Sequence, residues 1–310
     1  MLKRLILIFS LVVLSIFLIF AVLFFYYPSK TLLFSNISSY SSREDFALLL
    51  LGKPGIGYIG SENTDSIIVA YFQFKNNRIF LIPIPRDLVV FDSNKNLVKI
   101  NSLYHEKKTF LLLKKASEMT GLNIQNYIAY DLNLVIKMVD KIGGIEMVIK
   151  EPITDAVSYF TIYPGKRKIN GYLADLVLRS RFNKEGDFFR IKNQLEFISA
   201  LKNKIFSLSS SDKIALLKFI NDNRNHWDSN LDKNSFLNLF FKVKDLNKPE
   251  IIPIIIDLNS GFFSSGYVDI HNSQGVYAIF PKRGFDSYDQ IRPYIQSQIR
   301  KINFKYEKFL

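Results

Sequence analysis

An uncharged run of 23 residues, from Leu5 to Tyr27, constrains the folding of this chain more than any other feature. A helix of this length reaches roughly 34 Å at about 1.5 Å per residue, and the hydrocarbon core of a bilayer is about 30 Å thick. Tyr26 and Tyr27 fall where interfacial aromatic residues gather, and Pro28 ends the helix. We therefore expect a transmembrane helix here.

The alternative for this run is a cleaved signal peptide. A retained signal anchor is favoured, because the run is longer than a typical signal-peptide core and no small-x-small cleavage motif follows it. Lys3 and Arg4 predict a cytoplasmic N-terminus, although Lys30 weakens the charge asymmetry. The expected organisation is a single-pass cell-membrane protein, with a cytoplasmic tip and anchor (1–28), a serine-rich stalk (29–42) and an extracytoplasmic domain (43–310).

The charge of the chain indicates an anionic partner. The formal net charge is +13, and the absence of cysteine excludes disulfides, thiolate catalysis and cysteine-ligated zinc. An extracytoplasmic domain meets lipid phosphates and cell-envelope polymers. A membrane-tethered nucleic-acid binder is disfavoured, because it would rest on charge alone and the chain lacks a basic and aromatic stacking motif.

Hydrophobic periodicity predicts one α/β domain with a mixed sheet. The strand, helix and strand in succession over 126–149 predict a crossover and therefore parallel pairing. The Lys75-Asn76-Asn77 turn predicts a hairpin between its flanking strands. Strands are expected within 45–60 and at 65–74, 78–85, 126–132, 145–149 and, as the last one, 250–257; helices are expected at 107–122, 133–144, 171–181, 187–208, near 212–222 and 232–245, and at 288–302.

Arginine and aspartate side chains occur together where the predicted strands begin and end. Asp65 starts one strand, and Arg86 and Asp87 follow the next. A hairpin would bring Asp65 and Asp87 to one edge, where two carboxylates suit a shared Mg²⁺ ion. The alternative is that Asp65 binds turn amides and that Arg86 and Asp87 form a surface pair. Spacing alone favours this alternative.

A second group of polar residues lies near two predicted helix ends. Arg179 and Arg181 stand two apart, which suits an anion between them, although a solvated helix end is the common explanation. Asp187 is a candidate N-cap, and Arg190 and Gln194 are four apart on one helix face that borders an apolar stripe. With Lys99 and the aspartates, these arginines form a chemically coherent pyrophosphate site.

The order of motifs resembles the LytR-CpsA-Psr family. The motifs are TDS (64–66), IPRD (84–87), KINSLY (99–104), VDKIGGIEM (139–147), GYLADLVLRSR (171–181) and GDFFRIKNQ (186–194). The resemblance covers about residues 45–205, and the sequence through GYVDIHNSQGVYAIFP resembles the usual tail of that domain. Each motif alone is a weak signal, but their shared order is a strong one.

The resemblance implies a membrane-anchored transferase with a three-layer α/β/α sandwich fold, a central mixed sheet and an apolar tunnel for a lipid. Family members move a glycopolymer from a polyprenyl pyrophosphate carrier onto an envelope acceptor, typically peptidoglycan. They form a phosphodiester and release polyprenyl phosphate. The alternative for this chain is a non-catalytic protein that binds polyprenyl phosphate or regulates the envelope.

The resemblance also assigns roles to individual residues. Asp65 and Asp87 would hold Mg²⁺, with Mn²⁺ as an alternative ion. The pyrophosphate would contact Arg86, Lys99, Arg179, Arg181, Arg190 and Gln194, and Asp187 would support Arg190; the residues expected to be catalytic are Arg190, Asp187 and Arg86.

The chain also departs from the family's pattern. The arginine usual before the TD pair is absent, since Ser61, Glu62 and Asn63 occupy that stretch. HEKK stands where a glycine pair is usual, and Asn193 stands where an arginine is usual. These departures bear on rate and polymer specificity more than on the type of reaction.

Overall fold

The computed structural model describes residues 44–55, 60–232, 235, 239, 242, 249–271 and 273–307, without the side chains of 206, 210, 217 and 305–307. The expected cytoplasmic tip, anchor and stalk lie outside the described residues, as does most of the helix expected near 232–245. Within the described ranges, no helix combines the length and the hydropathy needed to cross a bilayer.

The chain forms two compact units, each built from segments that are distant in the sequence. The described residues of the first unit fall within 44–45, 72–79 and 132–252, and those of the second fall within 46–71, 80–131 and 253–307. The single domain expected for residues 43–310 stays a prediction, and the units are described one at a time.

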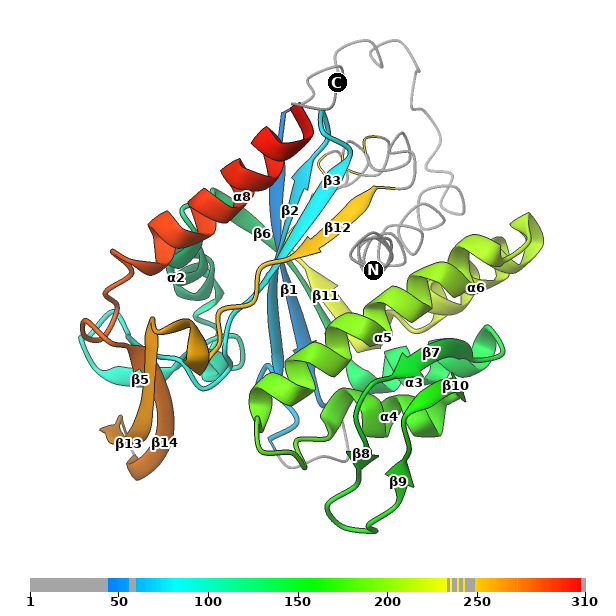
Figure 1. The fold of residues 1–310 in the computed structure, drawn as a ribbon, viewed down its shortest axis with the longest axis horizontal. Helices are drawn as coiled ribbons and strands as arrows, with labels where there is room; N and C mark the ends of the chain where they lie inside the picture. The colour runs from blue at the N-terminus through cyan, green and yellow to red at the C-terminus, as the bar shows by residue number, and fades with distance from the viewer. Residues whose placement is uncertain are drawn as a thin grey trace. The chain divides into compact units, whose positions relative to one another are not determined.

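The second unit contains the centre of the largest sheet. Four strands of this sheet lie wholly or mostly in the second unit: β1 (Phe46–Lys53), β2 (Ser66–Gln73), β3 (Arg78–Pro83) and β6 (Ile124–Asp131). The order of strands in the whole sheet is β11-β6-β1-β2-β3-β12 (Figure 1). β1 pairs parallel with β6, whereas β2 and β3 form the predicted hairpin, so the sheet is mixed as expected. Residues 47–52 of β1 are all buried, which is typical of a strand covered on both faces.

The second unit also contains β4 (Val89–Phe91), β5 (Leu97–Lys99), η3 (Ile100–Ser102), α2 (Thr109–Thr120) and α8 (Ile291–Glu307). Gly121 ends α2 with a left-handed φ of 72°, the conformation predicted by its position after the apolar run. The side chains of Arg292 and Gln296 in α8 each donate 2.7 Å hydrogen bonds, to the carbonyl groups of Glu118 and Thr120. These bonds tie α8 to the C-terminal end of α2.

The segment expected to be the last strand is not the last one. β12 (Glu250–Pro253) is followed by η5 (Leu258–Ser260) and by an antiparallel hairpin of β13 (Phe263–Ile270) and β14 (Ser273–Pro281). The sequence prediction missed this hairpin because β13 alternates between more and less exposed positions and contains few aliphatic residues. Such a strand lacks the apolar run from which the others were predicted.

The first unit contains α3 (Leu132–Lys141), β7 (Ile145–Ile149), β8 (Ile153–Thr154), β9 (Thr161–Ile162), β10 (Gly165–Ile169), α4 (Gly171–Arg179), α5 (Asp187–Ser207), α6 (Ser210–Asp222), η4 (Arg224–His226) and β11 (Trp227–Ser229). The predicted crossover from β6 through α3 to a parallel β7 is wrong. β7 pairs antiparallel with β10 in a separate two-stranded sheet, and the parallel partner of β6 is β1. β7 buries only alternate residues, as expected for a strand with one solvated face.

A long β-ribbon projects from the helices of the first unit. β7 and β10 pair at its base, and β8 and β9 pair toward its tip (Figure 1). At the base, Lys166 Nζ lies 2.7 Å from Glu146 Oε2 across the pair. The connection from β8 to β9 therefore lies at the end of the ribbon.

Gly171 allows α3 and α4 to approach closely, and we expect Gly171→Ala to destabilise the protein. The Gly171 N–H donates to Asp140 Oδ1 at 2.7 Å, and an added Cβ would lie 2.8 Å from the Ile136 carbonyl oxygen. Overpacking of this kind costs about 1–3 kcal/mol. Thermal unfolding against Gly266→Ala, whose Cβ would meet no atom within 4 Å, tests this. Equal melting temperatures for the two variants would contradict it.

Candidate functional site

Asp65, Arg86, Asp87 and Lys99 form a group in the second unit, which we call the carboxylate cluster. Asp65 lies directly before β2, and its N–H donates to the carbonyl of Gly52 in β1 at 2.7 Å. The β2–β3 pairing extends beyond β3, because the Ile84 N–H donates to the carbonyl of Ile67 in β2 at 2.8 Å. The start of β2 and the end of β3 therefore share one edge, as the sequence predicted.

The side chains of the cluster form a chain of ion pairs. Arg86 Nη1 contacts Asp65 Oδ1, and Arg86 Nε lies 3.5 Å from Asp87 Oδ2. Lys99 Nζ lies 2.8 Å from Asp87 Oδ1. One guanidinium therefore bridges the two carboxylates, and a lysine from β5 contacts the second carboxylate. Asp87 is buried, so Arg86 and Asp87 do not form the surface pair of the alternative hypothesis.

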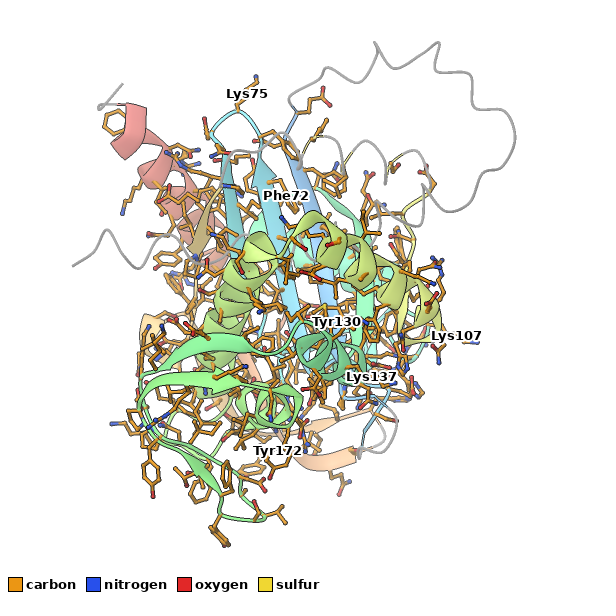
Figure 2. The ribbon with its side chains drawn as sticks, turned by 90° about the vertical axis from the view of Figure 1, so that its right-hand side faces the viewer. Phe72, Lys75, Lys107, Tyr130, Lys137 and Tyr172 are labelled. Atoms are coloured by element: carbon orange, nitrogen blue, oxygen red, sulfur yellow. The ribbon has the colours of Figure 1, made fainter. Side chains whose placement is uncertain are left out.

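The same edge contains the carboxyl ends of the parallel strands β1 and β6. The register pairs Gly52 with Tyr130 and Lys53 with Asp131. Burial raises the pKa of the Tyr130 hydroxyl, which is labelled in Figure 2, to about 12, so this group stays protonated. In open α/β sheets, ligands bind at the carboxyl ends of the strands. The carboxylate cluster is thus positioned as a ligand site of this fold type would be.

The residues present fit a hard divalent cation. Two carboxylates converge on one guanidinium, and carboxylate oxygens are the ligands that Mg²⁺ prefers. The formal charges of Asp65 and Asp87 are balanced by those of Arg86 and Lys99. A bound Mg²⁺ would leave two positive charges, so metal binding here needs an anion such as a phosphate. No group of three or more acidic or histidine side chains forms a metal cage in the described part of the chain.

The second group of residues, which we call the arginine cluster, lies in the first unit, where α4 ends and α5 begins. Asp187 Oδ1 contacts Arg190 Nη2 at 2.7 Å and Arg181 Nε at 3.3 Å. Gly186, not Asp187, is the N-cap of α5, and Asp187 is its first helical residue. The carboxylate still lies in the first turn, where the helix dipole favours negative charge.

The arginines differ in exposure. Arg190 is 1% exposed, whereas the side chains of Arg179 and Arg181 reach solvent. Arg179 Nη1 lies 3.1 Å from Asp175 Oδ2 within α4. Arg179 and Arg181 thus each contact an acidic side chain. They are the residues of this cluster most open to an external anion.

Gln194 is buried in the arginine cluster and holds the two helices together. Its Nε2 donates to the carbonyl of Leu178 in α4 at 3.1 Å. The predicted sharing of a helix face by Arg190 and Gln194 is consistent with the burial of both. A contact of Gln194 with a substrate stays a prediction, as do all the assigned roles in substrate and metal binding.

Comparison with known proteins identifies the family. The profile of the LytR_cpsA_psr family matches residues 28–276. The chain belongs to the LytR-CpsA-Psr family. The probable cell wall biosynthesis protein LcpB of Corynebacterium glutamicum is 33% identical over 145 residues, which are 47% of this chain and 35% of that protein. Regulatory protein MsrR of Staphylococcus aureus is 26% identical over 157 residues, 50% of this chain and 48% of MsrR.

The chain therefore spans between about a third and a half of the length of these curated relatives. Solved structures of other proteins share its fold. TagV of B. subtilis has a TM-score of 0.61 at 21% identity, over 82% of this chain and 97% of that chain. TagT bound to LIIa-WTA has a TM-score of 0.58 at 18% identity, over 82% and 91% of the two chains.

The sequence did not predict several polar contacts that lie beside the carboxylate cluster. Lys53 Nζ lies 3.3 Å from Glu62 Oε2, beyond the end of β1. Thr64 donates through both its N–H and its hydroxyl to the carbonyl of Asn101, at 3.0 and 3.2 Å. These bonds hold the segment before Asp65 against the one after Lys99. No local sequence signal marks a contact between residues this far apart in the chain.

Lys202, further along α5, is buried, and we expect Lys202→Met to stabilise the protein at pH 7. Burial lowers the pKa of Lys202 from 10.5 to about 8. Below pH 8 the ammonium is charged in the folded state and destabilises it; between pH 8 and 10.5 the unfolded state binds more protons, so this penalty fades. The gain at pH 7 should be at most about 3 kcal/mol, since the pKa falls by about 2.5 and each pKa unit corresponds to about 1.4 kcal/mol.

Urea unfolding at pH 7 and pH 10 measures this gain and its decline with pH. Lys204→Met, at a less buried position of the same helix, is the control. A destabilised Lys202→Met variant at pH 7, or a gain independent of pH, would show that the charge of Lys202 is not penalised.

Proposed function

We propose that this protein is a membrane-anchored phosphotransferase of cell-envelope assembly. It would transfer a glycopolymer from a polyprenyl pyrophosphate carrier to an envelope acceptor, most simply peptidoglycan. The acceptor hydroxyl forms a bond to the phosphorus that carries the glycan, and the bond from that phosphorus to polyprenyl phosphate breaks. The products are a phosphodiester and polyprenyl phosphate, whose oxygen takes up the hydroxyl proton.

The carboxylate cluster is the single observation that supports this proposal most strongly. In a member of this family, two carboxylates bridged by Arg86 lie at the sheet edge where ligands bind in such folds. Mg²⁺ bound there by Asp65 and Asp87, or Mn²⁺ in its place, would supply positive charge to the phosphate oxygens. Arg86 and Lys99, released from full pairing with the carboxylates, would then bind phosphate oxygens themselves.

The arginine cluster would bind and orient the same substrate. Phosphoryl transfer requires little covalent work from side chains, so fixed cations at the phosphate oxygens dominate catalysis. Arg179 and Arg181 are open to an external anion, and Asp187 fixes the fork of Arg190. Gln194 would keep α4 and α5 in register. In this proposal Arg190, Asp187 and Arg86 have the largest effects on rate.

The location and the finer architecture belong to the same proposal. Residues 5–27 would anchor the chain in the membrane, with the N-terminus in the cytoplasm and the bulk of the chain outside. The three-layer sandwich and the apolar lipid tunnel would follow the family. The name of LcpB, a probable cell wall biosynthesis protein, and TagT bound to LIIa-WTA both support an envelope glycopolymer as the substrate.

A non-catalytic regulator is the second candidate, and the names of two relatives favour it. MsrR is called a regulatory protein, and a Streptococcus mutans relative is called biofilm regulatory protein A. Incubating the full chain in vesicles with a polyprenyl pyrophosphate-linked saccharide, peptidoglycan as the acceptor and Mg²⁺ separates the two. An enzyme consumes the substrate over many turnovers and stops when the metal is chelated. A regulator binds the lipid without consuming it.

A further inference from the structure

The tip of the β-ribbon in the first unit presents apolar and aromatic side chains to solvent. Single exposed hydrophobic residues are common, but a contiguous group indicates an interaction site. The rings of Tyr159 and Phe182 pair edge-on at 6.5 Å, and those of Phe160 and Tyr172 at 6.2 Å. Figure 2 labels Tyr172. We call this group the aromatic tip; its exposed fractions are Val157 87%, Tyr159 72%, Tyr163 66%, Tyr172 66%, Phe182 55% and Phe160 44%.

The turn at the end of the ribbon is held in a costly conformation. Tyr159 has a φ of 57°, which is unfavourable for a bulky residue other than glycine. Its N–H donates to the carbonyl of Asp155 at 2.9 Å. The Asp155 carboxylate accepts from the N–H and the hydroxyl of Ser158, at 3.0 and 2.5 Å. These bonds hold a conformation that leaves Val157 and Tyr159 in solvent.

Apart from the tyrosine hydroxyls, the polar side chains at the tip form hydrogen bonds within the turn. Besides the Ser158 bonds, Thr154 Oγ1 and Thr161 Oγ1 lie 3.0 Å apart, and the Thr161 hydroxyl lies 3.3 Å from the carbonyl of Tyr159. The side chain of Val157, the most exposed member, has no hydrogen-bonding group. The turn therefore leaves few polar side chains other than the tyrosine hydroxyls for an external ligand.

Cations lie on β10, which follows Tyr163 of the aromatic tip along the chain. Lys166, Arg167 and Lys168 are consecutive and exposed. Lys166 pairs with Glu146, whereas Arg167 donates through Nε and Nη2 to the carbonyls of Tyr163 and Pro164, both at 3.0 Å. Arg167 is therefore held along the ribbon by carbonyl groups and keeps its charge for an external anion. Tyrosine, aliphatic side chains and basic residues together match an anionic lipid headgroup region.

We propose that the aromatic tip inserts into the headgroup region of an anionic bilayer, with the cations of β10 against lipid phosphates. The proposal goes beyond the phosphotransferase activity and does not depend on it, because it rests on the ribbon and the adjoining residues Tyr172 and Phe182 and on neither cluster. Insertion would fix the orientation of the first unit at the membrane. A soluble glycan fragment as the occupant is the alternative that the experiment tests.

The lack of cysteine in the chain makes a direct test simple. Val157→Cys carries an environment-sensitive fluorophore in the full chain, reconstituted in phosphatidylglycerol-containing vesicles. Ile214→Cys on α6, at a site 60% exposed in the same unit, is the matched control. We expect blue-shifted emission and quenching by spin-labelled lipid at position 157 only. Both signals should weaken in phosphatidylcholine vesicles, at high salt and in a Lys166→Glu, Lys168→Glu double variant.

Three results would overturn the proposal. The first is water-like emission at position 157 in anionic vesicles. The second is equal quenching at positions 157 and 214, which would mean nonspecific proximity to the bilayer. The third is a response at position 157 to soluble peptidoglycan fragments and none to lipid, which would make the aromatic tip a glycan platform. Equal melting temperatures of the labelled variants control for misfolding.

Discussion

Replacing Arg190 by lysine is expected to lower kcat by about 10²–10³, with most of the affinity for the lipid carrier retained. The guanidinium is buried and contacts Asp187 at 2.7 Å, and the same Asp187 oxygen contacts Arg181 at 3.3 Å. Lysine is a point charge without the planar fork that can span two oxygen atoms. The variant would therefore keep the net charge of the cluster but lose the fixed geometry that stabilises the transition state.

Steady-state kinetics with the lipid-linked substrate measures this loss as a split between kcat and KM. Arg224→Lys makes the same change on an exposed residue outside both clusters. Removing one partner of a buried pair costs about 3–5 kcal/mol, so thermal unfolding of both variants must accompany the kinetics. If Arg190→Lys kept kcat and raised only KM, Arg190 would be a binding residue and not part of transition-state stabilisation.

Asp65→Ala and Asp87→Ala are each expected to abolish magnesium-dependent transfer while the fold is retained. Each variant removes one of two carboxylates that converge on Arg86. The remaining cluster carries a net positive charge, which repels a divalent cation. The readouts are the rate as a function of Mg²⁺ concentration and, independently of activity, Mn²⁺ binding followed by electron paramagnetic resonance with pyrophosphate present.

The matched control for these variants is Glu62→Gln, which removes the neighbouring carboxylate that pairs with Lys53. In the wild type, Mn²⁺ should bind weakly without pyrophosphate and more tightly with it, because the cluster is electrically balanced before the metal enters. Normal turnover of Asp65→Ala at limiting Mg²⁺, together with unchanged Mn²⁺ binding, would show that the metal is held elsewhere.

Local patterns in the sequence predicted the hairpin edge of the site correctly. The Asn-rich turn at 75–77 favours a left-handed residue, and Asn77 adopts a φ of 51°. Once that hairpin is assumed, the alternation of the strands places Asp65 and Asp87 at one edge. The bridge by Arg86 and the contact of Lys99 with Asp87 depend on side-chain rotamers and on the position of β5. The spacing of residues in the sequence reports neither of these, so it could not predict the two contacts.

Long-range pairing is the part that the sequence did not determine. The IEMVI strand was assigned to a crossover because it follows a helix, but its partner is the charged GKRKI strand, which lacks a strand-like apolar pattern. The role of Gln194 was missed for a similar reason. Its hydrogen bond to the carbonyl of Leu178 depends on how two helices pack, which no motif spacing reports.

The measurement that tests the central claim most directly is the identity of the lipid product. The full chain in vesicles receives a polyprenyl pyrophosphate-linked saccharide, peptidoglycan and Mg²⁺, and mass spectrometry quantifies both products. The account predicts polyprenyl monophosphate and a phosphodiester-linked saccharide on the acceptor, in equal amounts. Release of polyprenyl pyrophosphate would mean that the sugar–oxygen bond breaks instead, and bound substrate without turnover would mean a regulator; either result would contradict a phosphotransferase.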